Sequence, residues 1–230
     1  MEPTHIFING CSFLTFRPRD NIMTHAGLEL EKLMGLKRGG HLAGGGRGNR
    51  RVSATTKIWC ERNPKLAKKC FFLIGITAGS RVDFPTNDGY KSKKFPSLKT
   101  TWKTFSPQKN PFAEKFYREL FNLGLDLDQL VQYESIEAIL SLQYYIKHKK
   151  YPYLIYNTLP DPAIKNKDVR VLYESVDQKR FYKIESSHYD FIIENNLIAH
   201  PSDPHPELEG HIYWAKQLLE FIDANNLRTT

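Results

Sequence analysis

The chain has 230 residues, of which 40% are hydrophobic, and it carries a net charge of +8 at neutral pH. That hydrophobic fraction is too high for a disordered chain, and the length suits one α/β domain. No apolar stretch is long enough to cross a bilayer, and the N-terminal residues lack the basic and apolar regions of a signal peptide. We therefore expect a single cytoplasmic domain over residues 1–230 without a membrane span.

The cysteines Cys11, Cys60 and Cys70 are odd in number and form no C-x-x-C pair. They are typical of reduced thiols in a cytosolic protein and predict neither a disulfide framework nor a zinc site. The positive net charge raises the question of a nucleic-acid partner.

Apolar runs and helical periodicities alternate in the first third of the chain. This alternation predicts parallel strands joined by right-handed helical crossovers. In chain order the expected elements are a strand that stops at Asn9-Gly10, a helix over Ile22–Met34 with Asn21 as N-cap and Gly35 as its stop, a strand ending at Leu42-Ala43, a helix over Asn49–Arg62 and a strand over Cys70–Ile76.

The middle of the chain interrupts this alternation. Residues 77–109 are rich in Gly, Pro, Ser and Lys and show no clear period, so we expect an excursion that could cover a site. The later elements are a helix beginning at Pro111, a helix over Asp128–Lys147, a strand over Tyr153–Asn157, a fifth strand or a hairpin in VRVLYES or FYKIE, and a last helix over Gly210–Asn225. The predicted fold class is α/β: a three-layer α/β/α sandwich with a flavodoxin-like parallel sheet of about five strands and an insertion at about 77–150.

Ser12 follows the first strand at once, after a turn that a glycine allows. In open α/β folds ligands bind at the carboxyl edge of the sheet, so a serine there is a candidate nucleophile held on a rigid element. The alternative is a chance G-x-S in an ordinary turn.

A second candidate segment is HPSDPHPELEGH, His200–His211, just before the last helix. Its prolines stiffen the loop, and Asp203 stands where its carboxylate could orient the imidazole of His205. Ser12, His205 and Asp203 would then supply a nucleophile, a base and an orienting acid. A Pro-rich surface turn with solvated polar groups is the alternative.

Taken together, these segments resemble the SGNH (GDSL-type) hydrolases in the right order along the chain. Gly10-Cys11-Ser12-Phe13 is similar to the family's Gly-Asp-Ser block, with Cys in place of Asp. The segment Leu42–Asn49 is similar to the second block with its glycine. Asp203-Pro204-His205-Pro206 is similar to the last block, although its Asp and His stand one residue closer than is usual.

The third block differs most from the family pattern. Gly75-Ile76-Thr77-Ala78 stands where the family has Gly-x-Asn-Asp, so Thr77 occupies the position of the oxyanion-binding Asn. Either Thr77 or Asn49 could supply that side chain, and Asn49 could equally be the N-cap of its helix. Arg81, just beyond, could meet an anionic or sugar substrate, or be a solvated arginine.

The resemblance implies a serine esterase that needs no cofactor or metal. Ser12 would attack an ester carbonyl with His205 as base, and the backbone N–H groups of Ser12 and Gly46 would hold the oxyanion. The implied partner is a small-molecule, carbohydrate or lipid ester.

Three other interpretations stay open. A catalytically inactive relative could act as a binding module. The basic runs could bind nucleic acid electrostatically, although no recognition motif accompanies them. A loop metal site could use the side chains of His200, Asp203, His205 and His211.

Overall fold

The computed structural model describes residues 2–79, 81–91, 99–105, 111–160, 167–200 and 202–229, and its central feature is one parallel sheet. The five strands lie in the order β2-β1-β3-β6-β7. They are β1 (His5–Asn9), β2 (Lys37–His41), β3 (Cys70–Ile76), β6 (Tyr153–Asn157) and β7 (Phe181–Ser187). This is the flavodoxin-like order, which confirms the predicted fold class.

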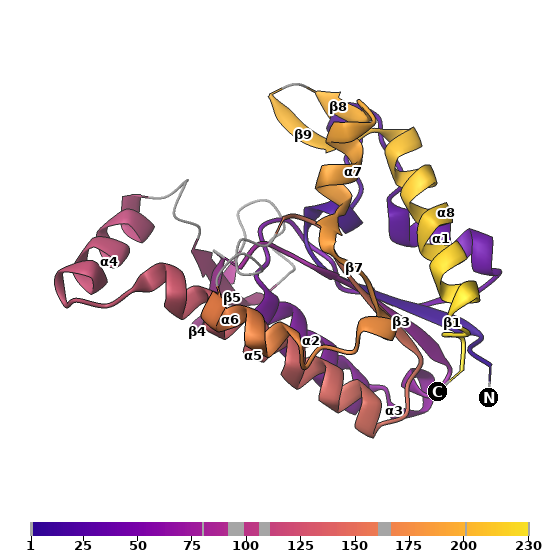
Figure 1. The fold of residues 1–230 in the computed structure, drawn as a ribbon, viewed down its shortest axis with the longest axis horizontal. Helices are drawn as coiled ribbons and strands as arrows, with labels where there is room; N and C mark the ends of the chain where they lie inside the picture. Colours follow the sequence, from indigo (N-terminus) through magenta and orange to yellow (C-terminus); the bar gives the residue numbers. More distant parts are fainter. Residues whose placement is uncertain are drawn as a thin grey trace.

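Helices cover both faces of the sheet and make the outer layers of the sandwich (Figure 1). One face carries α1 (Ala26–Met34) and α8 (Leu208–Ala224). The other carries α2 (Asn49–Arg62), α5 (Leu127–His148) and α6 (Lys167–Tyr173). A four-residue helix, α3 (Pro64–Ala67), leads into β3.

Strand β3 is buried along its whole length because both of its faces are covered. Phe71 and Leu73 pack with α1 and α8, whereas Phe72 and Ile74 pack with α2 and α5. Such two-sided burial explains the unbroken apolar run of CFFLIGI, since neither face of the strand meets water. Burying each of these side chains contributes about 1.5–3 kcal/mol to stability.

Some predicted boundaries differ from those of the structure. Helix α1 begins at Ala26, with His25 as its N-cap, because Asn21 instead ends a short 3-10 turn in the left-handed conformation. Strand β2 ends at His41, before Leu42-Ala43. FYKIE supplies the fifth strand, whereas the VRVLY part of VRVLYES belongs to α6.

The segment predicted as an insertion divides into two parts. A hairpin of β4 (Val82–Lys91) and β5 (Lys99–Phe105), followed by α4 (Pro111–Asn122), lies outside the central sheet. Helix α5, in contrast, packs directly on the sheet as a layer helix. The excursion from the sandwich therefore ends before α5, and it contains a hairpin that the sequence did not predict because residues 77–109 show no clear period.

The segment after β7 is more ordered than a Pro-rich loop. It forms α7 (His188–Glu194) and an antiparallel hairpin of β8 (Ile198–His200) and β9 (Asp203–Pro206), which leads directly into α8. In the part of the chain that the structure describes, no helix combines the length and apolarity needed to cross a membrane.

Candidate active site

Ser12 opens a 3-10 turn, Ser12–Leu14, three residues beyond the end of β1. The chain reaches it through Gly10, whose backbone runs against β3. A Cβ at Gly10 would lie 2.7 Å from the carbonyl oxygen of Gly75 and 2.9 Å from Cδ1 of Leu14. Because only a glycine fits this approach, Gly10 sets the turn that places Ser12 at the carboxyl edge of the sheet.

Asn9, the last residue of β1, ties this turn to helix α2. Its fully buried amide nitrogen lies within hydrogen-bond distance of the hydroxyls of Thr55 (3.0 Å) and Thr56 (2.9 Å) and the carbonyl oxygen of Val52 (3.1 Å). Its side-chain oxygen accepts a bond from the N–H of Gly10. The sequence suggested only a turn residue here, because a lone Asn before Gly gives no sign of a long-range anchor.

His205 lies beside Ser12, although 193 residues separate them in the chain. The β8–β9 hairpin presents the imidazole, and its Nε2 is 2.9 Å from the Ser12 hydroxyl oxygen. Phe13, the residue after the serine, packs its ring against the imidazole with the centroids 5.0 Å apart. The predicted nucleophile and the predicted base are therefore within hydrogen-bond reach of each other.

The structure places Asp203 at the start of β9, where its backbone pairs with that of His200. The Asp203 side chain lies outside the described part of the chain, so its part in orienting His205 stays a prediction.

His200 and His211, two other proposed ligands of a loop metal site, have different surroundings. The His200 ring bonds the Ser202 hydroxyl at 2.8 Å, and His211 is buried at the start of α8. Among the side chains that the structure describes, no group of three His, Cys, Asp or Glu residues could hold a metal ion.

The glycine-rich segment after β2 docks against the serine turn. Gly44 donates its N–H to the carbonyl oxygen of Gly10 at 3.1 Å. Gly46 lies further along this loop with φ +71° and open space where a Cβ would stand. Because no other group lies where a Cβ of Gly46 would stand, another molecule has room to approach its backbone.

Asn49 and Thr77 are bonded to each other instead of being free to meet a ligand. The buried Asn49 amide donates to the Thr77 carbonyl oxygen (2.9 Å) and to the Ser135 hydroxyl (2.7 Å), and its oxygen accepts the Thr77 N–H. Asn49 is the first residue of α2, whose N-cap is Gly48, so it is not the N-cap. It joins the start of α2 to the end of β3 and to α5.

Arg81 folds back over the end of β3. Its guanidinium donates to the Thr77 hydroxyl at 2.7 Å and approaches the carbonyl oxygen of Arg47 at 3.4 Å. The fully buried Asp83, at the start of the β4–β5 hairpin, accepts bonds from the N–H of Arg51 and from the Thr104 hydroxyl. Burial raises the Asp83 pKa, and these hydrogen bonds oppose the rise. Asp83 thereby attaches the hairpin to the N-terminus of α2, which the sequence gave no reason to expect.

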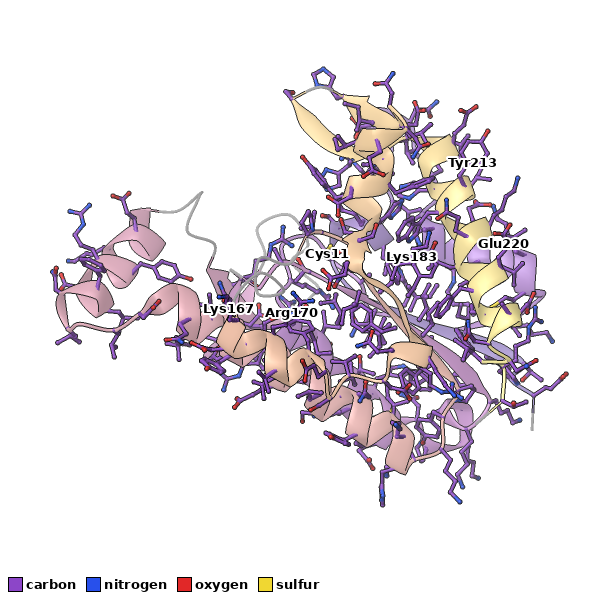
Figure 2. All side chains as sticks on the ribbon, viewed as in Figure 1. Cys11, Lys167, Arg170, Lys183, Tyr213 and Glu220 are labelled. Atoms are coloured by element: carbon purple, nitrogen blue, oxygen red, sulfur yellow. The ribbon has the colours of Figure 1, made fainter. Side chains whose placement is uncertain are left out.

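Cys11 turns away from the site. It is completely buried near the centre of the molecule (Figure 2), and its sulfur contacts the Thr158 hydroxyl at 3.0 Å. It packs with Ile192 and Leu197 in a small apolar cluster. Ser12, not Cys11, is therefore the side chain beside the imidazole.

Replacing Asn49 with alanine separates its two suggested roles. The contacts described above predict a loss of stability of about 2–4 kcal/mol, because the buried N–H and carbonyl of Thr77 lose their partners. Urea unfolding measures this loss. A direct oxyanion donor would instead lose roughly 3 kcal/mol of transition-state binding, a hundredfold or more in kcat, at unchanged stability.

The sequence matches no family model, and it has no match among the curated proteins compared with it. Among solved structures, the chain is similar to a catalytic mutant of an acetylxylan esterase from Geobacillus stearothermophilus, with 16% identity, a TM-score of 0.51 and coverage of 96% of this chain and 95% of that one. It also resembles a putative GDSL-like lipase from Parabacteroides merdae, with 14% identity, a TM-score of 0.47 and coverage of 99% and 98%.

The chain thus has the same type of fold as the acetylxylan esterase, an α/β/α sandwich around a five-stranded parallel sheet, which is the fold class that the sequence predicted. At this level of identity the likeness establishes the fold alone.

Proposed function

We propose that this protein is a serine esterase that cleaves acetyl or other short acyl esters through an acyl-enzyme intermediate. The observation that carries the proposal is the 2.9 Å distance between the Ser12 hydroxyl oxygen and His205 Nε2 at the carboxyl edge of the sheet. A serine hydroxyl is a weak nucleophile until an adjacent base removes its proton. The imidazole of His205 stands close enough to the hydroxyl to serve as this base.

The first half of the reaction follows from this pair. The Ser12 proton passes to His205 Nε2 while the serine oxygen bonds to the ester carbonyl carbon. The tetrahedral intermediate then expels the alcohol, which leaves with the proton from His205. The ring of Phe13 keeps the imidazole beside the serine during both transfers. Asp203 is the proposed partner that fixes the imidazole tautomer.

Backbone N–H groups are the proposed donors to the oxyanion. Ser12 is the first residue of its 3-10 turn, and the first N–H groups of a helical turn have no partner within it. Gly46 offers an open backbone on the loop that docks against Gly10. With the Asn49 amide engaged in structural bonds, these two N–H groups carry the larger share of the stabilisation.

In the second half of the reaction, water attacks the acyl-enzyme with His205 again acting as base, and the acid is released. Arg81 and Arg47 stand near the same sheet edge, and Arg81 is the proposed contact for an anionic or sugar part of the substrate. A screen of acetylated sugars and of lipid and small-molecule esters would define the natural substrate class.

A serine-directed fluorophosphonate tests the proposal directly. We expect one adduct per chain, mapped to the peptide that contains Ser12, because only an activated serine displaces fluoride from phosphorus. The matched control is the Ser12→Ala protein, which should stay unlabelled although every other serine remains. Labelling that persists in Ser12→Ala would contradict the proposal, because a different serine would then be the activated one. No labelling of the folded wild-type chain would also contradict it and would favour an inactive binding module.

A further inference from the structure

The edge of the sheet opposite Ser12 is strongly basic. In a parallel sheet all amino ends meet at one edge, so residues that precede neighbouring strands come together there. Strands β3, β6 and β7 are neighbours, and two cations stand shortly before each of them. These are Lys68 and Lys69, Lys149 and Lys150, and Lys179 and Arg180.

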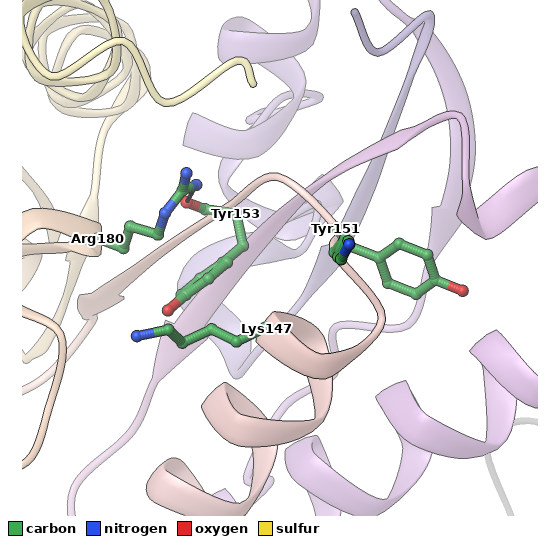
Figure 3. Close-up of a pocket in the computed structure, with 5 residues that line it drawn as sticks. Lys147, Tyr151, Tyr153 and Arg180 are labelled. Carbon is green, nitrogen blue, oxygen red and sulfur yellow. Dashed lines mark hydrogen bonds between the residues drawn. The ribbon is translucent and has the colours of Figure 1, made fainter. Parts of the chain in front are cut away.

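A pocket of about 410 Å³ opens at this edge (Figure 3). Its lining comes from the end of α5, the start of β6 and the residue before β7: Lys147, Lys150, Tyr151, Tyr153 and Arg180. That volume lies within the range of small-molecule binding sites. The pocket is separate from the serine site, which lies at the carboxyl ends of the strands.

The pocket keeps a positive charge after its internal contacts are counted. Among the described residues that line it, Lys147 has a carboxylate partner, Asp177, at 3.2 Å. The Arg180 guanidinium donates to the backbone oxygens of Thr229 (2.8 Å), Leu227 (3.5 Å) and Tyr153 (3.5 Å), which are neutral partners that leave its positive charge in place. The partial negative charge at the C-terminal end of α5 is about half a unit. It is too small to cancel the two positive charges of Lys150 and Arg180.

Lys150 adopts a backbone conformation that a lysine rarely takes. Its φ is +55°, just after the end of α5, where glycine is the preferred residue. The N–H of Lys150 bonds the Lys147 carbonyl oxygen, as in an ordinary helix C-terminus. The backbone conformation at this position therefore favours glycine. Because a lysine there is strained, its ammonium group is a candidate for a functional role.

Tyr153 adds a polar group without a partner. Its side chain is 1% exposed, and its hydroxyl makes no hydrogen bond with any residue that the structure describes. Figure 3 shows this hydroxyl directed toward the amino group of Lys147. An unpaired buried hydroxyl lowers the stability of the protein. Such a group is a common feature of a binding site, where the bound molecule supplies the missing hydrogen bond.

From this pocket we infer a binding site for a phosphate group, carried by a phosphorylated small molecule. Lysine ammonium groups act as point charges for phosphate, and the Arg180 guanidinium adds a further positive charge to the site. The lysines that precede β3 and β7 raise the local concentration of anions around the pocket. The site provides a second, non-catalytic function on the face away from the serine.

The test measures binding of pyrophosphate and of ATP in EDTA to the full-length chain by calorimetry at low salt. Three proteins are compared: wild type, Lys150→Gly and Lys216→Gln. Lys150→Gly removes the cation and relieves the backbone strain, so we expect its melting temperature to be unchanged or higher and its phosphate affinity to fall at least tenfold. Lys216→Gln removes one positive charge from the exposed face of α8, and this variant should bind pyrophosphate and ATP as the wild type does.

The two ligands and a duplex DNA arm distinguish the sources of phosphate. Equal loss of pyrophosphate and ATP affinity in Lys150→Gly supports the pocket, and tighter binding of ATP identifies a nucleotide as the fuller ligand. If the Lys150→Gly protein does not fold, the Lys147→Gln variant takes its place in the test, and we expect the same loss of phosphate affinity. The inference would be overturned if the wild type bound neither ligand, or if Lys216→Gln lost as much affinity as Lys150→Gly. It would also be overturned if the protein bound only DNA and the Lys150→Gly substitution left that binding unchanged.

Discussion

Replacing Ser12 with alanine is expected to lower kcat for p-nitrophenyl acetate by roughly six orders of magnitude, the scale seen when a serine hydrolase loses its nucleophile. The hydroxyl forms the covalent bond to the acyl group, and nothing near it can take over, because the adjacent Cys11 thiol is buried against Thr158. Release of p-nitrophenol, followed at 400 nm or so, measures the effect. The melting temperature should change little, since Ser12 is only partly buried.

The partner variant and a matched control make this test sharper. His205→Ala should lose nearly as much activity, and the double variant should lose little more, because the two side chains act as one unit. Ser202→Ala removes a serine from the same hairpin, where it bonds His200 and not His205, and should keep full activity. An enzyme that is insensitive to both Ser12→Ala and His205→Ala would exclude the proposed mechanism.

Acidification is expected to unfold the protein far more steeply than its carboxylates alone would cause. Three histidines are buried in the neutral form. Burial, followed by the nearby charge of His41, lowers the pKa of His25 to about 2, and burial with the neighbouring His205 lowers that of His211 to about 3. Burial also holds the pKa of His188, which stacks on Trp214, well below its usual value.

The direction of the effect follows from proton binding. An unfolded histidine titrates near pH 6.5, so below that pH the unfolded chain binds protons that the folded chain cannot accept. The stability from these groups is fully present above about pH 7 and is lost as the pH falls toward the folded pKa values. Each group contributes about 1.4 kcal/mol per pH unit, so together they lower the free energy of unfolding by about 4 kcal/mol per unit below pH 6.

Urea unfolding at several pH values between 7.5 and about 4.5 measures this slope. A stability of ordinary size, about 5–15 kcal/mol, would be exhausted within a few pH units. His25→Asn keeps an acceptor for the N–H of Leu28 at the start of α1 but cannot titrate, so the slope should fall by about a third. The exposed His148→Asn is the control and should leave the slope unchanged. A slope that is the same in all three proteins would contradict the assignment.

The regular part of the fold could be read from the sequence. Strands β1, β3 and β6 and helix α2 stand where the apolar runs and the 3.6-residue period placed them, because burial on both faces leaves an unambiguous pattern. The hairpin of β4 and β5 had no such pattern. The N-cap of α1 was missed because Asn21 was the stronger capping residue by type, whereas the chain uses His25.

Ser12 and His205 were found because each stands in a distinctive local sequence, a glycine turn after a strand and a proline-flanked loop before a helix. Side chains that position them were not found. Asn9 and Phe13 act through partners from 43 residues to nearly 200 residues away, and no local pattern encodes such contacts.

The sequence by itself determined the alternation of strands and helices that builds the central sandwich, the residue types of the candidate serine and histidine, and the excess of positive charge. Only the tertiary structure decided that Ser12 and His205 meet, that the Asn49 amide is engaged by Thr77 and Ser135, and that Lys150 and Arg180 line one pocket. The physical reason for this difference is that an apolar periodicity can be recognised within a short stretch of neighbouring residues. The direction of a polar side chain is settled only when distant segments pack and compete for its hydrogen bonds.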